Sequence, residues 1–384
     1  MPDHLKGNHY GPILKAFVLH QYHFLCVTQP LLLEQLHEWG IDISSGQLNR
    51  LLIEDQDIFH EEKDELLKAG LSASNHIHVD DTGARHKAKN GYCTHIGNEF
   101  FAWFQSTNSK SRINFLELLR AGETDYVVDN DALDYMRQQK LPKELLKLLS
   151  INIGTFSDEA TWELHLKSMG FTKRRHIKIA TEGALVGSIL SHGFNINLAI
   201  VSDDAGQFNV FQHALCWVHA ERKINELIPL NPQHAVSIAG IRNFFWLLYD
   251  DLKEYKKAPT TEKKVALSLQ FDQLFEMETS FETLNQVLKR LKRNKSELLL
   301  VLEIPDLPLH NNLSERDIRE YVKRRKISGG TRSDLGRQCR DTFASLKKTC
   351  RKLNVKFWKY LLDRIQGENQ VAGLPSMVSQ AAAL

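Results

Sequence analysis

Three acidic motifs lie far apart in the sequence, and each places carboxylates where a strand-like run ends or a polar helix begins. Asp80 and Asp81 follow the alternating run 76–79, Asp203 and Asp204 follow the apolar run 198–201, and Glu315 lies within the polar stretch 311–316. Carboxylates at the ends of buried strands destabilise a fold unless they bind something cationic. Two strand-end aspartates and one helical glutamate can hold a pair of divalent metal ions for in-line phosphoryl transfer.

Strand alternation limits how many of these carboxylates can share one site. Successive side chains on a strand point to opposite faces, so only one residue of Asp80 and Asp81, and one of Asp203 and Asp204, can face the same metal ions. Taken singly, each aspartate can equally be a turn or capping residue, because Asp is common at both positions. The spacing therefore indicates a metal site without deciding which residue of each pair belongs to it.

Cys216 and His219, with His213 nearby, form a second cluster that can be compared with zinc sites. A structural zinc ion takes four ligands, and no second ligand pair with suitable spacing follows in the sequence. We therefore predict that Cys216 and Trp217 pack against the core and that His219 lines the edge of the acidic site or a DNA groove.

The composition is that of a globular protein without a membrane segment. The 384 residues are 42% hydrophobic and 25% charged, enough for two or three domains. No apolar run reaches the ~18 residues of a membrane span, and residues 1–6 lack the apolar core of a signal peptide. Five scattered cysteines contain no close pair and fit a reducing compartment, so we expect a cytoplasmic protein.

Positive charge is concentrated near the C-terminal end, although the net charge is only +2. From Glu315 to Arg364 there are sixteen Lys and Arg residues against six Asp and Glu residues, a local excess that attracts phosphate backbones. The alternative is a solvated helix face. At helical spacing Glu315, Arg319 and Lys323 share one face. The candidate DNA contacts are Arg316, Arg319, Lys323, Arg324, Arg325, Lys326 and Arg332.

Residues 1–74 are predicted to be helical. Pro30 suits the first turn of one helix, Gly40 suits its end, and Ser44 and Ser45 are capping candidates for the next. A helix, a turn with glycine and a capped helix together resemble a helix-turn-helix, but such pairs are also common in proteins that do not bind DNA.

The remaining segments alternate between strand-like and helical patterns. Residues 75–122 contain three short strands and a helix, with hairpin signals at Asn90-Gly91 and Gly97-Asn98. We predict that this is the first part of a catalytic core, followed by a mainly helical insertion (123–194), the second part of the core (195–230), an all-helical insertion (231–308), a core helix with basic helices after it (309–366) and a disordered tail (367–384).

Four motifs in this order resemble the bacterial DDE transposases of the insertion sequence 66 family. HVDDTG at 78–83 is similar to the family's HVDET strand, VSD at 201–203 to its VSDG strand, LCWVHAERK at 215–223 to its LCWAHLxRK segment, and NNLSER at 311–316 to its NNxxER segment. GGTRS at 329–333 and YGP at 10–12 match more loosely. The resemblance covers roughly residues 8–365, and four ordered motifs are far more specific than any one.

The resemblance implies a fold, a reaction and a set of site residues. The fold is an α/β RNase H-like mixed sheet with a helical N-terminal region and two mainly helical insertions. Asp80, Asp203 and Glu315 correspond to the catalytic metal ligands, with two Mg²⁺ or Mn²⁺ ions per site, and His219 and Asn312 lie at the site edge. The expected partners are double-stranded DNA, both transposon ends and target, and at least one further copy of the chain.

The sequence departs from the family pattern at several points. Residue 81 is Asp where Glu is usual, residue 204 is Asp where Gly is usual, the stretch 123–194 is longer, and the family's upstream zipper and zinc-binding cysteine cluster have no counterpart. These departures concern DNA-end recognition more than the core chemistry. Two alternatives remain: a truncated or domesticated copy that binds DNA without transposing it, and a stand-alone metal-dependent nuclease of RNase H-like fold.

Overall fold

The computed structural model describes residues 10–383 and divides into two compact units. Within the described part, unit 1 comprises residues up to Ser74, residues 81–196 and the residues from Arg316 onward. Unit 2 comprises residues 75–80 and 197–315. Asp80, Asp203 and Glu315 therefore all belong to unit 2, although they are widely separated in sequence.

A mixed five-stranded sheet confirms the predicted α/β RNase H-like core. Its strand order is β3-β2-β1-β6-β7. β2 and β3 are antiparallel, whereas β1 pairs with β6, and β6 with β7, in parallel. The strands are β1 (His76–Gly83), β2 (Tyr92–Gly97), β3 (Ala102–Thr107), β6 (Ala199–Ser202) and β7 (Gln212–Leu215).

The strand sequences explain which strands are buried. All four residues of β6 are buried, as expected for a parallel strand that reads as a continuous apolar run. β1 is buried from Ile77 to Val79 and becomes partly exposed from Asp80. The polar end of this strand is therefore where the acidic motif meets solvent.

Helix α16 (Asp334–Lys352) covers the outer edge of β3 with polar side chains. The backbone N–H groups of alternate residues on β3 donate to Thr349 Oγ1 (3.1 Å from Ala102), Ser345 Oγ (2.9 Å from Phe104) and Asp341 Oδ2 (2.7 Å from Ser106). Four residues of an α-helix advance about 6 Å along its axis, and two residues of a strand advance about 6.6 Å. Every fourth side chain of α16 can therefore meet every second backbone N–H of β3. This edge of the sheet is thereby closed to pairing with another strand.

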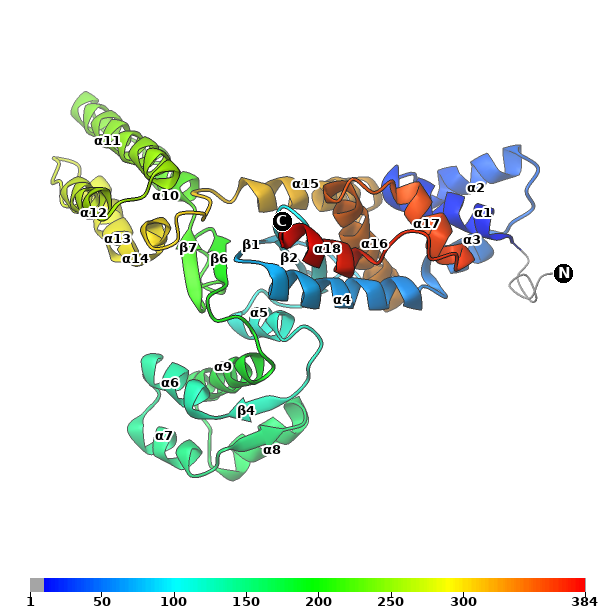
Figure 1. Cartoon of the computed structure of the whole chain (residues 1–384), viewed down its shortest axis with the longest axis horizontal. Helices are drawn as coiled ribbons and strands as arrows, with labels where there is room; N and C mark the ends of the chain where they lie inside the picture. Colours follow the sequence, from blue (N-terminus) through cyan, green and yellow to red (C-terminus); the bar gives the residue numbers. More distant parts are fainter. Residues whose placement is uncertain (1–9, 384) are drawn as a thin grey trace. The chain divides into compact units, whose positions relative to one another are not determined.

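The N-terminal region is helical, as predicted. Ser44 accepts a hydrogen bond from the Gln47 backbone and Gln47 bonds back, which completes a capping box at the start of α3. Gly40 has a φ of +74° just after α2, the left-handed conformation that glycine favours. The elements are α1 (Pro12–Leu19), η2 (His20–Phe24), α2 (Gln29–Glu38), α3 (Ser45–Ile53) and α4 (Asp57–Ala73). Figure 1 shows α4 alongside α16.

The segment predicted as a mainly helical insertion also contains a small sheet. β4 and β5 pair in an antiparallel manner, and α9 packs against α6 and β4. The elements from the end of the first core part onward are α5 (Arg112–Leu119), β4 (Tyr126–Val128), α6 (Asn130–Gln138), α7 (Lys143–Ser150), β5 (Gly154–Phe156), α8 (Glu159–Ser168) and α9 (Arg174–Ser191).

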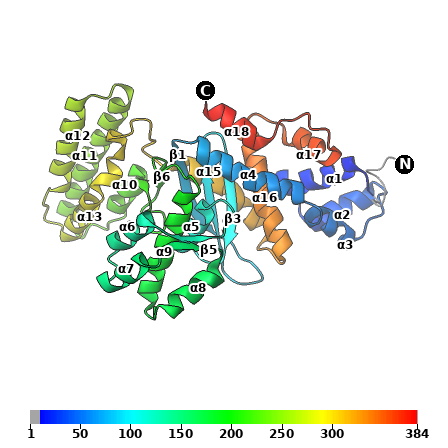
Figure 2. The same cartoon turned by 60° about the horizontal axis from the view of Figure 1, so that its bottom comes forward.

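The second insertion is entirely helical, as predicted. Its core surrounds Trp217, Phe245 and Phe271, and Figure 2 shows α11, α12 and α13 side by side. The helices of this part are α10 (Trp217–Asn225), α11 (Pro232–Lys257), α12 (Thr261–Phe275), α13 (Glu282–Arg293), α14 (Lys295–Leu298) and η3 (Leu300–Leu302).

The C-terminal residues differ from the prediction of a disordered tail. After α15 (Asn312–Ser328), α16 and α17 (Phe357–Gln366), residues Leu374–Ala382 form α18, which packs on α4. Leu374 and Val378 are fully buried there. The composition of this tail is small and polar, but two apolar residues four positions apart suffice to seat a short helix on an existing core. Within the described residues, no helix combines the length and apolarity that crossing a membrane requires.

Candidate active site

Asp80 lies on β1, and Asp203 directly follows the neighbouring parallel strand β6. The register of β1 and β6 pairs His76 with Ala199 and His78 with Val201. Two residues further along each chain, the same register reaches Asp80 and Asp203. Neighbouring strands lie about 4.8 Å apart, so these two carboxylates emerge from the same edge of the sheet, and both residues are partly exposed.

Asn311 fixes the start of α15 against β1. It is fully buried, and its Nδ2 donates to the Val79 carbonyl at 2.8 Å while its Oδ1 accepts from His78 Nδ1 at 2.8 Å. Its backbone N–H donates to Cys216 Sγ at 3.2 Å. Two of these partners, His78 and Val79, directly precede Asp80 on β1, and the third, Cys216, directly precedes α10. Asn311 therefore ties the first turn of α15, which carries Glu315, to the acidic end of β1.

His219 and Arg222 on α10 contact the Glu315 carboxylate. His219 Nε2 lies 3.3 Å and Arg222 Nη2 3.9 Å from Glu315 Oε1. Burial and the Arg222 cation lower the pKa of His219, while the charges of Asp203 and Glu315 act in the opposite direction. Because the pKa of His219 is lowered, the neutral imidazole is favoured at neutral pH. Its Nε2 faces the Glu315 carboxylate, to which an N–H there can donate.

The second aspartate of the β6 motif has its own set of cationic partners. Asp204 pairs with Lys223 and with Arg290 Nη2 at 2.8 Å, and accepts from Asn294 Nδ2 at 3.3 Å. Burial alone would raise the pKa of Asp204, but Lys223 and Arg290 outweigh it and hold that pKa below its ordinary value. Asp203 instead accepts the Ala205 backbone N–H at 3.0 Å, which shapes the turn after β6.

The second aspartate of the β1 motif is likewise engaged elsewhere. Asp81 Oδ1 accepts a hydrogen bond of 2.5 Å from Thr94 Oγ1 on β2, within unit 1. This contact agrees with the alternation that turns Asp80 and Asp81 to opposite faces. Asp81 and Asp204 thus have structural partners of their own.

Neutralising these two outer aspartates is expected to have a mild effect on catalysis. Asp81→Asn and Asp204→Asn should each keep DNA nicking within about tenfold of the unmodified chain, because the lost charge lies outside the face that carries the candidate metal ligands. Nicking rates of a supercoiled plasmid at saturating Mg²⁺ measure this effect. An inactive Asp81→Asn beside an active Asp80→Asn would show that the assigned strand register is wrong by one residue.

The donor set suits a hard divalent cation. Asp80, Asp203 and Glu315 are partly exposed carboxylates that offer oxygen atoms, the ligands that Mg²⁺ and Mn²⁺ prefer. The nearby thiol of Cys216 is buried and accepts the Asn311 N–H, and burial raises the pKa of Cys216. Cys216 is therefore a packed core thiol, as predicted, and Trp217 beside it is fully buried.

The basic residues after Glu315 fall into two groups. The side chain of Arg324 is buried, and the partly exposed Arg325 donates to the Gly83 carbonyl and to Thr82 Oγ1, so both are engaged within unit 1. The other candidates are exposed and available to a phosphate backbone: Arg316, Arg319, Lys323, Lys326 and Arg332. Asn312, predicted at the site edge, is the exposed first residue of α15.

The sequence does not reveal the roles of two residues near the site, Asn311 and Arg222. Asn at the start of a helix predicts a side-chain cap, but the Asn311 side chain instead joins β1 and α15, and its carbonyl serves the helix by accepting from the Glu315 N–H at 3.3 Å. Arg222 lies in the same motif as His219, three residues later, and this helical spacing is the signal that could have placed it beside Glu315.

Comparisons with known proteins agree with this geometry. The sequence profile described as "Transposase IS66 family" matches residues 186–339, which include Asp203, His219 and Glu315. An uncharacterized protein, y4jO, of Sinorhizobium fredii (strain NBRC 101917 / NGR234) is 43% identical over 321 residues, 83% of this chain and 100% of the relative. With its four ordered motifs and its mixed sheet, the chain belongs to the IS66 family of transposases.

Proposed function

We propose that this transposase cuts DNA at transposon ends and joins the resulting 3′-hydroxyls to target DNA by metal-assisted phosphoryl transfer. The observation that carries the proposal is the parallel pairing of β1 with β6, which directs Asp80 and the residue after β6, Asp203, to the same end of the sheet, with the helix of Glu315 joined to β1 through Asn311. Three carboxylates from three segments far apart in the sequence all belong to unit 2 and offer the oxygen ligands that a divalent cation requires.

The proposed cofactors are two Mg²⁺ or Mn²⁺ ions held by Asp80, Asp203 and Glu315. When bound, such ions activate the attacking oxygen and stabilise the leaving 3′-oxygen. The protein's own contribution is to position the carboxylates. Asn311 fixes the helix that carries Glu315, and the β1–β6 register fixes the two aspartates.

His219 is proposed as a positioning residue for Glu315. As a neutral imidazole 3.3 Å away, it orients the carboxylate without competing with a metal ion for its charge. Arg222, 3.9 Å from the same oxygen and half-exposed, is placed to meet a phosphate of the bound DNA strand.

The proposed partners are double-stranded DNA and a second copy of the chain, acting at the nucleoid in the bacterial cytoplasm. Val236, Phe244 and Leu247 on α11 are all more than half exposed, as are Val265 and Leu269 on α12, the helix that packs against α11. This surface in unit 2 is a candidate contact between copies assembled on paired ends.

A strand-transfer assay tests the proposal against its two alternatives. The full chain is incubated with DNA carrying the transposon ends, a supercoiled target plasmid and Mg²⁺ or Mn²⁺. Joined products support a transposase. Nicking without joining would indicate a stand-alone nuclease, and binding without any metal-dependent nicking would indicate a copy that only binds DNA.

The exposed basic face of α15 is expected to supply much of the salt-dependent DNA affinity. Neutralising Arg319, Lys323 and Lys326 to Gln should weaken binding to all sequences and flatten the log–log salt dependence by up to about 2.7 units, roughly 0.9 per phosphate contact. Duplex titrations at several salt concentrations measure this slope.

A matched control removes three exposed lysines from the insertion instead: Lys143, Lys147 and Lys167. This control should keep the original slope. Equal slopes for both triple variants would show that the α15 charges form a solvated surface and that DNA lies elsewhere, for example along α2 and α3.

A further inference from the structure

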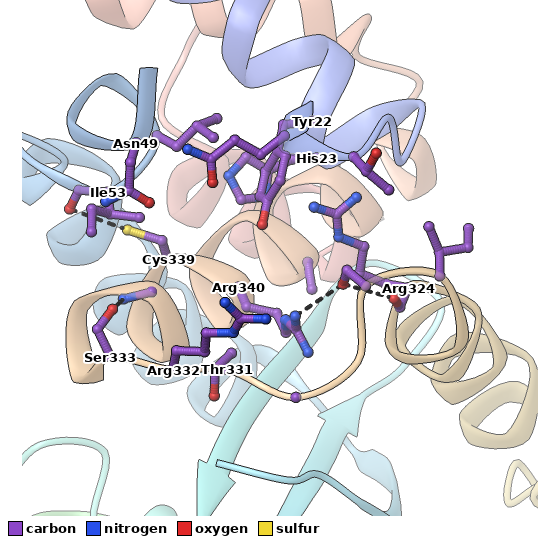
Figure 3. A pocket seen from close by; sticks show the side chains of 18 of the residues that line it. Tyr22, His23, Asn49, Ile53, Arg324, Thr331, Arg332, Ser333, Cys339 and Arg340 are labelled. Carbon is purple, nitrogen blue, oxygen red and sulfur yellow. Dashed lines mark hydrogen bonds between the residues drawn. The ribbon is translucent and has the colours of Figure 1, made fainter. Parts of the chain in front are cut away.

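Unit 1 contains a cavity of about 690 Å³ between its N-terminal helices and the basic C-terminal helices. η2, α2 and α3 contribute one wall, including Tyr22 and Asn49, and α15, α16 and the loop between them contribute the other, including Arg324 and Arg340. Figure 3 shows Tyr22 and His23 across the cavity from Arg332 and Arg340. This volume lies in the range of small-molecule sites.

The lining of this cavity is strongly positive. Arg324, Arg332, Arg340 and Lys347 are its cationic side chains, and Glu320 is its anionic one. The Glu320 carboxylate is already engaged by Lys347, Lys348 and Arg351. The pKa of His23 on the opposite wall is lowered well below its ordinary value by burial and, in addition, by Arg324, Lys347 and Arg340. The cavity thus has a surplus of positive charge that no carboxylate in its wall neutralises.

Arg324 is the least satisfied of these cations. It is 7% exposed, and neither Nη1 nor Nη2 has a hydrogen-bond partner among the described residues. Its guanidinium lies 3.8 Å from the centre of the Tyr22 ring, a cation–π contact that supplies no anion. A guanidinium stays charged, and buried charges are normally paired and hydrogen-bonded. Arg324 therefore lacks an anion that a ligand in the cavity can supply.

The loop between α15 and α16 is built to hold this wall in place. Gly329 has a φ of +66°, and a Cβ on Gly330 would lie 2.5 Å from the Arg85 carbonyl oxygen. Thr331 N–H donates to that carbonyl at 3.0 Å, and Arg340 Nη1 donates to the Gly329 carbonyl at 2.8 Å. The glycine pair is therefore required by backbone geometry, and Arg340 is positioned on the wall by the loop itself.

We propose that this cavity binds a single nucleotide of a DNA strand, with its phosphate at Arg324 and Arg340 and its base against the aromatic wall at Tyr22. Paired guanidiniums fit phosphate oxygens, and a tyrosine ring offers a stacking surface to any base. The cavity volume exceeds what a phosphate ion occupies, and its opposite wall carries apolar side chains such as Leu33 and Ile53. The choice of a DNA strand as the source of the nucleotide rests on the proposed function.

Calorimetric titration of the full chain tests this site with defined probes. The probes are inorganic phosphate, thymidine 5′-monophosphate, a 5′-phosphorylated single-stranded tetranucleotide and a duplex without free overhangs. The tetranucleotide should bind at least about tenfold more tightly than phosphate, since the base and strand add stacking and backbone contacts. Arg340→Gln, at a partly exposed position, should weaken tetranucleotide binding by about tenfold or more through loss of one charge-assisted hydrogen bond.

Two further variants complete the test, one within the cavity and one outside it. Tyr22→Ala should weaken the tetranucleotide more than inorganic phosphate, because it removes the stacking surface and leaves the cations. Arg175→Gln removes the same charge from the exposed start of α9, outside the cavity, and should leave tetranucleotide binding unchanged.

The outcomes separate this site from the overall activity. Equal affinity for phosphate and tetranucleotide would overturn the nucleotide assignment and leave only an anion site. Tight binding of the mononucleotide but not of the tetranucleotide would overturn the DNA strand as its source. No binding of any small probe, with duplex binding and metal-dependent nicking intact, would overturn the site and leave the proposed function standing.

Discussion

Asp80→Asn, Asp203→Asn and Glu315→Gln are each expected to abolish DNA cleavage and strand transfer. Each substitution removes one negative charge from the proposed metal ligands and scarcely changes the side-chain volume. The loss should exceed the roughly 10- to 100-fold that removing an outer-shell partner of a metal site costs. Nicking and joining of labelled DNA in Mg²⁺ and in Mn²⁺ measure it.

The fold should survive these three substitutions, because the affected side chains are partly exposed. Urea unfolding midpoints therefore accompany the activity assays. Asp250→Asn is a matched control: it makes the same chemical change in the same unit, on a side chain that is 66% exposed and forms an ion pair with Lys253 one turn along α11. Near-normal cleavage by any one of the three site variants, with metal in excess, would remove that residue from the ligand set.

The strand-end carboxylates were predictable because their signals are local. The apolar run before Asp203 and the alternating run before Asp80 each specify a strand, and parallel pairing then brings the ends of the strands together. The Ser44 cap and the Gly40 helix end are likewise set by residues within a few positions of each other. For such features the sequence contains the whole physical cause.

The contacts that fix Glu315 were not predictable in this way. Asn311 bonds His78 and Val79, more than 230 residues earlier in the chain, and nothing in the local pattern distinguishes this arrangement from an ordinary helix cap. Ser345 and Thr349 cover the β3 edge because the spacing of side chains along α16 matches the spacing of backbone N–H groups along β3, more than 240 residues earlier in the chain. Such contacts follow from the assembled fold, so periodicity alone does not reveal them.

The local excess of positive charge was also only partly informative. Lys348 and Lys352 pair with the buried Asp317 at 3.0 and 2.8 Å, and burial is outweighed there by His95 and these lysines, so the pKa of Asp317 lies far below its ordinary value. These lysines stabilise unit 1 and are not placed to bind DNA. A count of charges does not separate such internal pairs from the exposed cations of α15.

The largest stability effect is expected at Glu62, whose carboxylate joins three helices of unit 1. It is 7% exposed and accepts from Arg364 Nε at 2.9 Å, Arg364 Nη2 at 3.0 Å, Tyr360 OH at 2.7 Å and the Leu374 backbone at 2.8 Å. Arg364 itself is 8% exposed. Glu62→Gln removes the carboxylate that accepts from both Nε and Nη2 of this buried guanidinium and leaves Asp363 as its remaining counter-charge, so the free energy of unfolding should fall by up to about 3–5 kcal/mol.

Urea unfolding followed by tryptophan fluorescence measures this loss, and an exposed ion pair supplies the control. Glu123→Gln breaks the pair with Lys68, whose side chains are 40% and 55% exposed, and should cost less than about 1 kcal/mol. If Glu62→Gln costs no more than this control, the buried network is not what anchors α17 and α18 to α4. The double variant Glu62→Leu with Arg364→Met separates the contribution of charge from that of packing. Arg364→Met alone leaves the buried Glu62 carboxylate without its guanidinium, so the double variant should lose less free energy of unfolding than this single variant.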